Sequence, residues 1–216
     1  MSVKLVLFDL DGTLADSFDG IAASLRVALS SFGIDAGSDE NLRKYIGPPL
    51  RQSFKEYNGM SEEEAELATA RYREHFRNEG VSLYKFYPGV EEMLESIHSS
   101  GIQMAIATTK AASYARLIVE PFIRYFAFIS GSEMDGTRSD KEELIKYALA
   151  NIPGAAPQST LMVGDRIHDI EGASACKVAS VGVRYGYGTE DELAGADYLC
   201  DTPKDVAELA SKLALL

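Results

Sequence analysis

The order of apolar patterns along the chain restricts its fold more than any single residue does. Residues 3–8 form a short, mostly apolar run, which is typical of a strand buried on both faces of a parallel sheet. Residues 16–86 then show only helical periodicity, and from residue 87 onward short apolar runs alternate with helical patterns. Alternating strands and helices predict βαβ units, so we expect an α/β protein whose parallel sheet carries helices on both faces.

The helical segment after the first strand is too long to be an ordinary connection. A crossover between parallel strands needs only a dozen or so residues, whereas this segment has about 70. Ser61 and Glu64 form a capping box that begins one of its helices. We therefore predict a Rossmann-like, doubly wound core of residues 1–15 and 87–216, with residues 16–86 inserted as an all-helical cap that acts as a lid.

Composition limits the partners and the location that we expect. The 216 residues carry 33 acidic and 21 basic side chains, whereas nucleic-acid-binding proteins neutralise phosphates with clustered lysine and arginine. No apolar stretch approaches the roughly 18 residues of a membrane span, and the run at residues 5–8 is too short for a signal peptide. We expect a cytoplasmic protein that binds neither nucleic acid polymers nor membranes. The sequence leaves open whether it is a monomer or a homodimer.

Unusual polar residues follow several of the predicted elements. Ligands of open α/β sheets bind beyond the carboxyl ends of the strands, where such residues meet. A capping box of Ser139 and Glu142 predicts the start of the helix that carries Lys141. We predict that one site contains Asp9 and Asp11 after the first strand, Thr108, Thr109 and Lys110 after the strand at 102–107, Lys141, and Asp165 and Asp169 after the strand at 161–163.

The aspartates of this group favour a metal ion. Asp165 and Asp169 share one face if a helix begins there, although helix capping alone would also account for them. With Asp9 close by, mutual repulsion would raise the pKa values of these carboxyls unless a cation compensated. Mg²⁺ is a hard cation that prefers oxygen ligands. The candidate Mg²⁺ residues are Asp9, Asp11, Asp165 and Asp169.

The hydroxyl and ammonium groups favour a phosphorylated ligand. Thr108, Thr109 and Lys141 offer donors that suit the non-bridging oxygens of a phosphate. Taken alone, Thr108 would be an ordinary strand end and Lys141 an exposed helix lysine, and only the combination favours a phosphate site. Asp9 and Asp11 add reactive groups, because one carboxylate can attack an electrophile while the other handles a proton.

Together these motifs resemble those of the haloacid dehalogenase-like (HAD) hydrolases. Residues 9–14, DLDGTL, resemble the DxDGT nucleophile motif of that family. Thr108 matches the second motif, Lys141 the third, and residues 164–169, GDRIHD, the GDxxxD fourth. The order and spacing of the four motifs span nearly the whole chain, which makes the resemblance far more specific than the DxD pair alone.

Further segments resemble one branch of the family. Residues 46–50, 87–89 and 185–188 are similar to the phosphoglycolate phosphatase-like branch. Residues 139–143, SDKEE, depart from the Lys-Pro-x-Pro that this branch often has around the third-motif lysine. Together with residues 165–169 they look more like its 5′-nucleotidase members.

The resemblance implies a role for each motif residue. Asp9 would attack the phosphorus and form an aspartyl-phosphate, while Asp11 would protonate the leaving oxygen and then activate water. Mg²⁺ would be held by Asp9, the backbone carbonyl of Asp11 and Asp165, with Asp169 in support. The phosphate-binding and charge-stabilising residues would be Asp9, Thr108, Thr109 and Lys141.

The expected activity is that of a Mg²⁺-dependent phosphomonoesterase acting on a small phosphorylated metabolite, as phosphoglycolate phosphatases do. A 5′-nucleotidase acting on nucleoside monophosphates is the alternative, followed by a sugar-phosphate mutase and a non-enzymatic phospho-accepting switch. Dehalogenation is disfavoured, because the dehalogenase branch lacks the aspartate found here as Asp11.

The cap is expected to choose the substrate. Pro48 and Pro49 would fix a loop that presents Lys44 or Arg51, and a cation there suits a carboxylated phosphate such as 2-phosphoglycolate. The candidates for substrate contact are Lys44, Gly47, Pro48 and Arg51. The aromatic residues that would instead stack on a nucleotide base, or else pack within the cap's own core, are Tyr45, Phe54 and Tyr57. Whether Arg51 or His168 contacts substrate stays open.

Overall fold

The computed structural model of the protein describes residues 2–135 and 137–215. The chain divides into two compact units. One contains the residues up to Asp16 together with those from Phe86 onward, and the other runs from Ser17 to Lys85. The sequence-based borders placed residues 16 and 86 in the inserted segment, whereas the structure places both in the larger unit.

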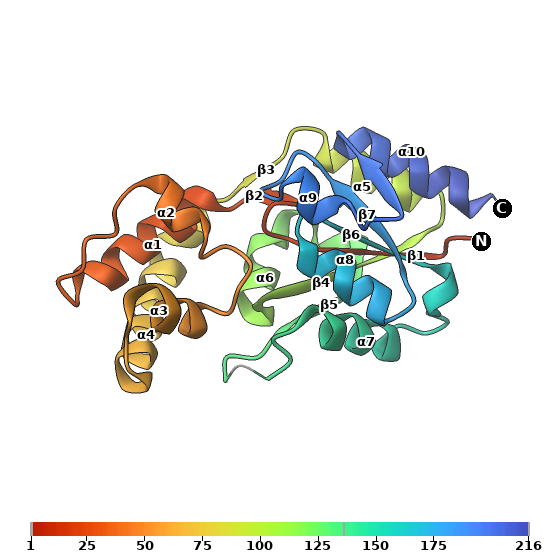
Figure 1. Ribbon diagram of the computed structural model, residues 1–216. Coiled ribbons are helices and arrows are strands. Elements are labelled where there is room, and N and C mark those ends of the chain that lie inside the picture. Colours follow the sequence, from red (N-terminus) through yellow and green to blue (C-terminus); the bar gives the residue numbers. More distant parts are fainter. Residues whose placement is uncertain (1, 136, 216) are drawn as a thin grey trace. The chain divides into compact units, whose positions relative to one another are not determined.

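The larger unit is built on a six-stranded sheet (Figure 1). The strands, in their spatial order, are β5 (Phe126–Ser132), β4 (Gln103–Ala111), β1 (Leu5–Phe8), β6 (Thr160–Gly164), β7 (Ala179–Val183) and β8 (Tyr198–Cys200). Every neighbouring pair is parallel, which confirms the predicted doubly wound α/β fold. The order reverses at β1, because the chain builds β4 and β5 on one side of it and β6 to β8 on the other. Ligands of open α/β sheets bind at such a reversal, beyond the carboxyl ends of the strands.

Helices cover both faces of this sheet. The α5 and α10 helices pack together on one face, and α7 and α8 pack together on the other (Figure 1). The helices of this unit are α5 (Val90–Ser99), α6 (Ala112–Ile118), α7 (Lys141–Asn151), α8 (Ile167–Ala175), α9 (Glu190–Leu193) and α10 (Pro203–Ala214), with 3₁₀ turns at Glu120–Tyr125 and Pro157–Ser159. Among the described residues, no helix combines the length and apolarity that a membrane crossing requires.

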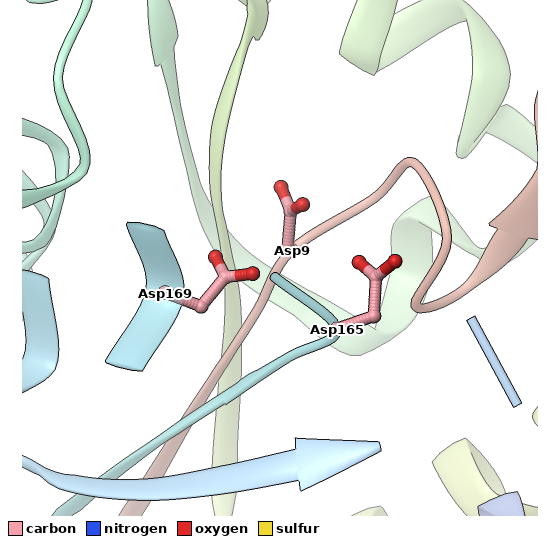
Figure 2. A group of neighbouring side chains, drawn as sticks. All are labelled: Asp9, Asp165 and Asp169. Carbon is pink, nitrogen blue, oxygen red and sulfur yellow. The ribbon is translucent and has the colours of Figure 1, made fainter. Parts of the chain in front are cut away.

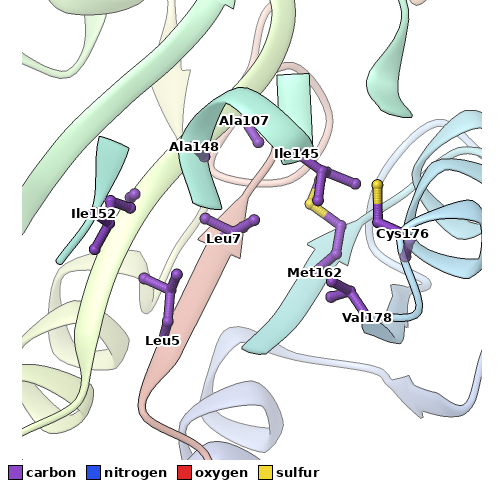
Figure 3. Close-up of a cluster of buried hydrophobic side chains, with 11 residues drawn as sticks. Leu5, Leu7, Ala107, Ile145, Ala148, Ile152, Met162, Cys176 and Val178 are labelled. Carbon is purple, nitrogen blue, oxygen red and sulfur yellow. The ribbon is translucent and has the colours of Figure 1, made fainter. Parts of the chain in front are cut away.

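The central strand is buried on both faces, as its continuous apolar run predicts. All four residues of β1 are buried, and its side chains alternate between the two helical layers. Leu5 and Leu7 pack against Ile145 and Ala148 of α7 and against Met162 of β6 (Figure 3). This apolar contact anchors α7 over the middle of the sheet, and α7 begins at Lys141, a residue of the predicted site.

The smaller unit is helical, as its periodicity predicts. It contains α1 (Phe18–Ser30), α2 (Asp39–Arg43), α3 (Leu50–Asn58), α4 (Glu62–Asn78) and a 3₁₀ turn at Gly80–Leu83. The capping box is confirmed, because Ser61 Oγ accepts from Glu64 N and Glu64 Oε2 accepts from Ser61 N. Two short strands, β2 (Ala15–Asp16) and β3 (Lys85–Phe86), pair where the chain leaves and re-enters the larger unit.

Two local predictions are wrong. The strand expected at 102–107 continues to Ala111, so Thr108 to Lys110 lie within β4 and do not follow it. The helix that carries Lys141 has no capping box of Ser139 and Glu142. Asp140 is its N-cap instead, and its carboxylate accepts a hydrogen bond from Glu143 N at 2.8 Å. Aspartate is as good an N-cap as serine, so local sequence alone does not distinguish the two positions.

We expect Leu7→Ala to lower the free energy of unfolding by about 2–5 kcal/mol, because the substitution leaves a cavity between β1 and α7. Leu117 is an exposed leucine of the same unit and serves as the matched control. Leu117→Ala should change the free energy of unfolding by less than about 0.5 kcal/mol. Urea unfolding followed by circular dichroism measures both values. Equal losses in the two variants would show that Leu7 does not belong to the core.

Candidate active site

The predicted site residues come together at the carboxyl ends of three neighbouring strands. Asp9 directly follows β1, and its backbone N–H donates to the carbonyl oxygen of Val163 on β6 at 2.9 Å. Thr108 lies near the end of β4, on the other side of β1. Asp165 is the first residue after β6. The parallel register therefore places residues from distant parts of the chain at one edge of the sheet.

Three carboxylates form a buried cluster at this edge. Among the residues that the structure describes, Asp9, Asp165 and Asp169 each offer an oxygen within 4.8 Å of the others (Figure 2). Asp169 also accepts a hydrogen bond from the backbone N–H of Arg166 at 3.1 Å, so it caps the start of α8 as well. Capping and membership of the cluster are therefore compatible roles for one carboxylate.

Lys141 is buried in the same cluster. Its Nζ lies 2.8 Å from Asp9 Oδ1 and 2.8 Å from Asp169 Oδ1, and it donates to the carbonyl oxygen of Ala107 at 2.9 Å. Only 5% of its surface is exposed, so the interpretation as an exposed helix lysine is wrong. Burial alone would lower its pKa, but the Asp169 and Asp9 carboxylates outweigh that effect and raise it. Lys141 is therefore a fixed positive charge between two carboxylates.

Asp165 is held by two loops. Its Oδ2 accepts from the backbone N–H of Tyr187 at 2.8 Å, and its Oδ1 accepts from Thr13 Oγ1 at 3.2 Å. A Cβ on Gly12, whose φ is 85°, would lie 2.1 Å from Asp165 Oδ2, and one on Gly188 would lie 1.8 Å from the Asp165 backbone oxygen. Both loops therefore need glycine where they approach this carboxylate.

A further contact ties the loop after β7 to the site. The Arg166 guanidinium makes two hydrogen bonds to the Glu192 carboxylate of α9, at 2.8 and 3.0 Å. Sequence reasoning assigned no role to Arg166, Glu192 or Tyr187. The glycines within residues 185–188 were the only local signal that this segment approaches another part of the backbone closely.

The electrostatic balance of the cluster fits a divalent cation. Burial, together with the nearby Asp169 and Asp9 carboxylates, raises the pKa of Asp165 to about 8. Burial also raises the pKa of Asp169, although Lys141 opposes this. Three carboxylates face one ammonium group, so their repulsion is only partly compensated. An all-oxygen donor set with excess negative charge is what Mg²⁺ prefers.

Asp11 points to a different partner. Its Oδ2 lies 3.0 Å from Lys110 Nζ, and its side chain is not among the three that form the acidic cluster. Thr108 is buried, and its Oγ1 accepts from the backbone N–H of Lys110 at 3.3 Å. Thr109 is half-buried, and its carbonyl oxygen accepts from Ser132 Oγ at 2.8 Å. The sequence placed Lys110 in this group without a role, and its ion pair with Asp11 appears only in the structure.

The cap candidates make contacts within the smaller unit. The Arg51 guanidinium forms ion pairs with Glu62 and Glu66, and Lys44 Nζ lies 4.6 Å from the centre of the Tyr57 ring. Gly47 has a φ of 107°, and Pro48 lies two residues before α3. Of the aromatic residues, Tyr45 and Phe54 are buried with their ring centres 5.9 Å apart, and Tyr57 is half-buried. The first two therefore pack within the unit's own core.

Comparison with known proteins adds independent observations. The family model described as haloacid dehalogenase-like hydrolase matches residues 6–183. A 5′-nucleotidase of Pseudomonas aeruginosa is 45% identical over 190 residues, which cover 87% of this chain and 86% of that protein. A phosphoglycolate phosphatase of Vibrio parahaemolyticus is 28% identical over 221 residues, covering 97% of this chain and 96% of that protein.

Two further similarities concern a kinase and a solved structure. Tyrosine-protein kinase PtkA of Mycobacterium tuberculosis is 36% identical over 192 residues, which cover 88% of this chain but 65% of that protein. The crystal structure of a predicted phosphatase from Clostridium acetobutylicum superposes with a TM-score of 0.91 at 39% identity, and each chain is covered completely. The protein therefore belongs to the haloacid dehalogenase-like hydrolase family and is a phosphatase of that family.

Proposed function

We propose that this phosphatase is a Mg²⁺-dependent phosphomonoesterase that forms an aspartyl-phosphate at Asp9. The observation that carries the proposal is the setting of Asp9, whose carboxylate is clustered with those of Asp165 and Asp169 and contacts the buried Lys141 ammonium. The residues that would hold Mg²⁺ are Asp9, Asp165 and the backbone carbonyl of Asp11, with Asp169 in support. When bound, Mg²⁺ supplies positive charge that offsets the repulsion between a carboxylate and a phosphate dianion.

In the first half of the proposed reaction, Asp9 attacks the phosphorus. We assign the attack to Oδ2, because Oδ1 contacts Lys141. The bond from phosphorus to the leaving oxygen breaks as Asp11 donates a proton to that oxygen. Thr108, Thr109 and Lys141 bind the oxygens of the transferring group, and the fixed charge of Lys141 stabilises the negative charge on them.

In the second half, Asp11 takes a proton from a water molecule as that water attacks the phosphorus of the aspartyl-phosphate. The bond between Asp9 and phosphorus breaks, which releases inorganic phosphate and restores the Asp9 carboxylate. The proton taken from water returns Asp11 to its starting state, so one residue serves first as acid and then as base.

We assign the smaller unit, from Ser17 to Lys85, the role of a cap that excludes water and selects the substrate. Nucleoside 5′-monophosphates are the substrate class that we place first, ahead of phosphoglycolate. Two observations support this order. The relative with 45% identity bears the name 5′-nucleotidase, and the charge of Arg51, the cation proposed for a carboxylated substrate, is already paired with Glu62 and Glu66. Lys44, Gly47, Pro48 and Arg51 remain the cap candidates for substrate contact.

A hydrolysis panel tests the substrate class. We expect kcat/KM for nucleoside 5′-monophosphates to exceed that for 2-phosphoglycolate and sugar phosphates by about tenfold or more, a ratio that binding-pocket contacts can supply. Phosphate release with and without Mg²⁺ measures it. Preference for 2-phosphoglycolate would reverse the order. Phosphate retained on the sugar would indicate a mutase, and stable protein phosphorylation without turnover would indicate a switch.

Asp9→Asn should lower kcat by at least about a thousandfold, because removal of a nucleophile abolishes the covalent route. Borohydride reduction of the acid-quenched wild type, followed by mass spectrometry, should locate the phosphorylated residue at Asp9. Asp191→Asn, which changes an exposed carboxylate of α9, is the matched control and should retain activity. Hydrolysis by the Asp9→Asn protein in the presence of Mg²⁺ would contradict the assignment.

Mg²⁺ should stabilise the wild-type protein, since a ligand that binds only the folded state adds about 3 kcal/mol at a hundred times its Kd. Calorimetric melting with Mg²⁺ or with EDTA measures the difference in Tm. Asp165→Asn should reduce this difference, because it removes one charged oxygen donor, whereas the exposed control Asp191→Asn should keep it. An unchanged shift in Asp165→Asn would place the bound Mg²⁺ elsewhere.

A further inference from the structure

A second lysine near the site, the half-buried Lys110, pairs with the second aspartate of the Asp9–Asp11 motif. Each aspartate of the motif contacts a different lysine. Lys141 Nζ lies 2.8 Å from Asp9 Oδ1, and Lys110 Nζ lies 3.0 Å from Asp11 Oδ2. The Lys110 and Asp11 side chains are only 9% and 16% exposed, so the pair is largely withdrawn from water. Lys110 has no role in the proposed two-step reaction.

The irregular end of β4 positions Lys110. Thr108 pairs with Gly131 of β5, but the next paired residue on β4 is Ala111, so residues 109 and 110 bulge from the ladder. A Cβ on Gly131 would lie 2.7 Å from the Lys110 carbonyl oxygen, which indicates how closely the bulge packs on the neighbouring strand. The Thr108 hydroxyl and Ser132 Oγ bond to the backbone of this segment.

Stability is a weak explanation for this pair. Withdrawing two charges from water is costly, and the attraction between them often does no more than offset that cost. The backbone around Lys110 is held by a bulge, a close glycine contact and two side-chain hydrogen bonds, which together fix the point from which its side chain extends. Bulges near active sites are known to re-aim side chains. The observations therefore favour a role in orienting Asp11.

We propose that Lys110 is a positioning residue for Asp11, and this inference rests on the proposed function. Lys110 holds Oδ2 of Asp11 and thereby fixes the orientation of the carboxyl group that transfers the proton. In the first half-reaction the proton passes from Asp11 to the leaving oxygen as its bond to phosphorus breaks. In the second half a proton returns to Asp11 from the attacking water. Lys110 itself contacts neither the phosphorus nor the leaving group.

The test compares two esters in the presence of Mg²⁺. A nucleoside 5′-monophosphate has an alkoxide leaving group that needs a proton, whereas the nitrophenolate of p-nitrophenyl phosphate departs without one. The ratio kcat/KM reports steps up to departure of the leaving group, so it isolates the first half-reaction. General acid catalysis contributes about 10²–10⁴-fold. We expect Lys110→Met to lower kcat/KM about a hundredfold for the nucleotide and less than about tenfold for p-nitrophenyl phosphate.

Further measurements separate positioning from other roles. The inhibition constant of inorganic phosphate should stay unchanged in Lys110→Met, and an equal loss on both esters with weaker phosphate inhibition would overturn the proposal in favour of direct phosphate binding. Lys110→Arg, which keeps a cation, should recover part of the nucleotide activity. Lys146→Met is the matched control, because Lys146 is an exposed lysine paired with Glu142 outside the site.

A double-mutant cycle gives a second, independent criterion. If Lys110 acts through Asp11, its removal in an Asp11→Asn background should cost no further nucleotide activity, whereas independent roles would add. Lys110→Gln replaces Lys110→Met if the latter fails to fold, as judged by circular dichroism. Wild-type protein that hydrolyses neither ester would overturn the proposed function itself. An active wild type whose Lys110 variants show additive losses would overturn only this inference.

Discussion

The crowding of three buried carboxylates at one edge of the sheet is the constraint on which the rest of the site depends. Like charges in a buried position repel, so each of Asp9, Asp165 and Asp169 must be held against that repulsion. Lys141 compensates two of them directly, and it reaches them because α7 packs against α8 over the sheet. The apolar contacts of Leu7 that anchor α7 are thus part of what keeps the charged site assembled.

The loops around the site hold the remaining carboxylate with neutral hydrogen-bond donors instead of a charged group. The third carboxylate, Asp165, contacts a hydroxyl from Thr13 and a backbone N–H from Tyr187, and both are neutral donors. Glycine at positions 12 and 188 lets those loops come close enough, since a Cβ at either position would overlap Asp165. Neutral donors leave the net negative charge of the cluster in place. The attraction of the cluster for a divalent cation is then undiminished, whereas a further lysine at this point would weaken that attraction.

The sequence predicted the fold, and it predicted that Asp9, Lys141, Asp165 and Asp169 lie close together. Its errors share a cause. Strand and helix patterns, chain order and a capping box are local properties, and they led to the doubly wound sheet and to the helical nature of the smaller unit. Lys141 was assigned to the site only through the combination of motifs, because helical position alone does not report burial. Three further features depend on contacts that a local sequence pattern does not reveal. They are the N-cap at Asp140, the extension of β4 and the ion pairs of Arg51.

By itself, the sequence determined which elements form and in what order, because apolar periodicity and turn chemistry act over a few residues. It thereby also determined which residues lie at the carboxyl edge of the sheet. Only the tertiary structure decided which of them touch. Lys141 bridges Asp9 and Asp169 because of how α7 packs, and Lys110 pairs with Asp11 beside a bulge between β4 and β5. Charge interactions weaken with distance and strengthen with burial, and both are set by the tertiary structure, so residue type and spacing leave those pairings undetermined.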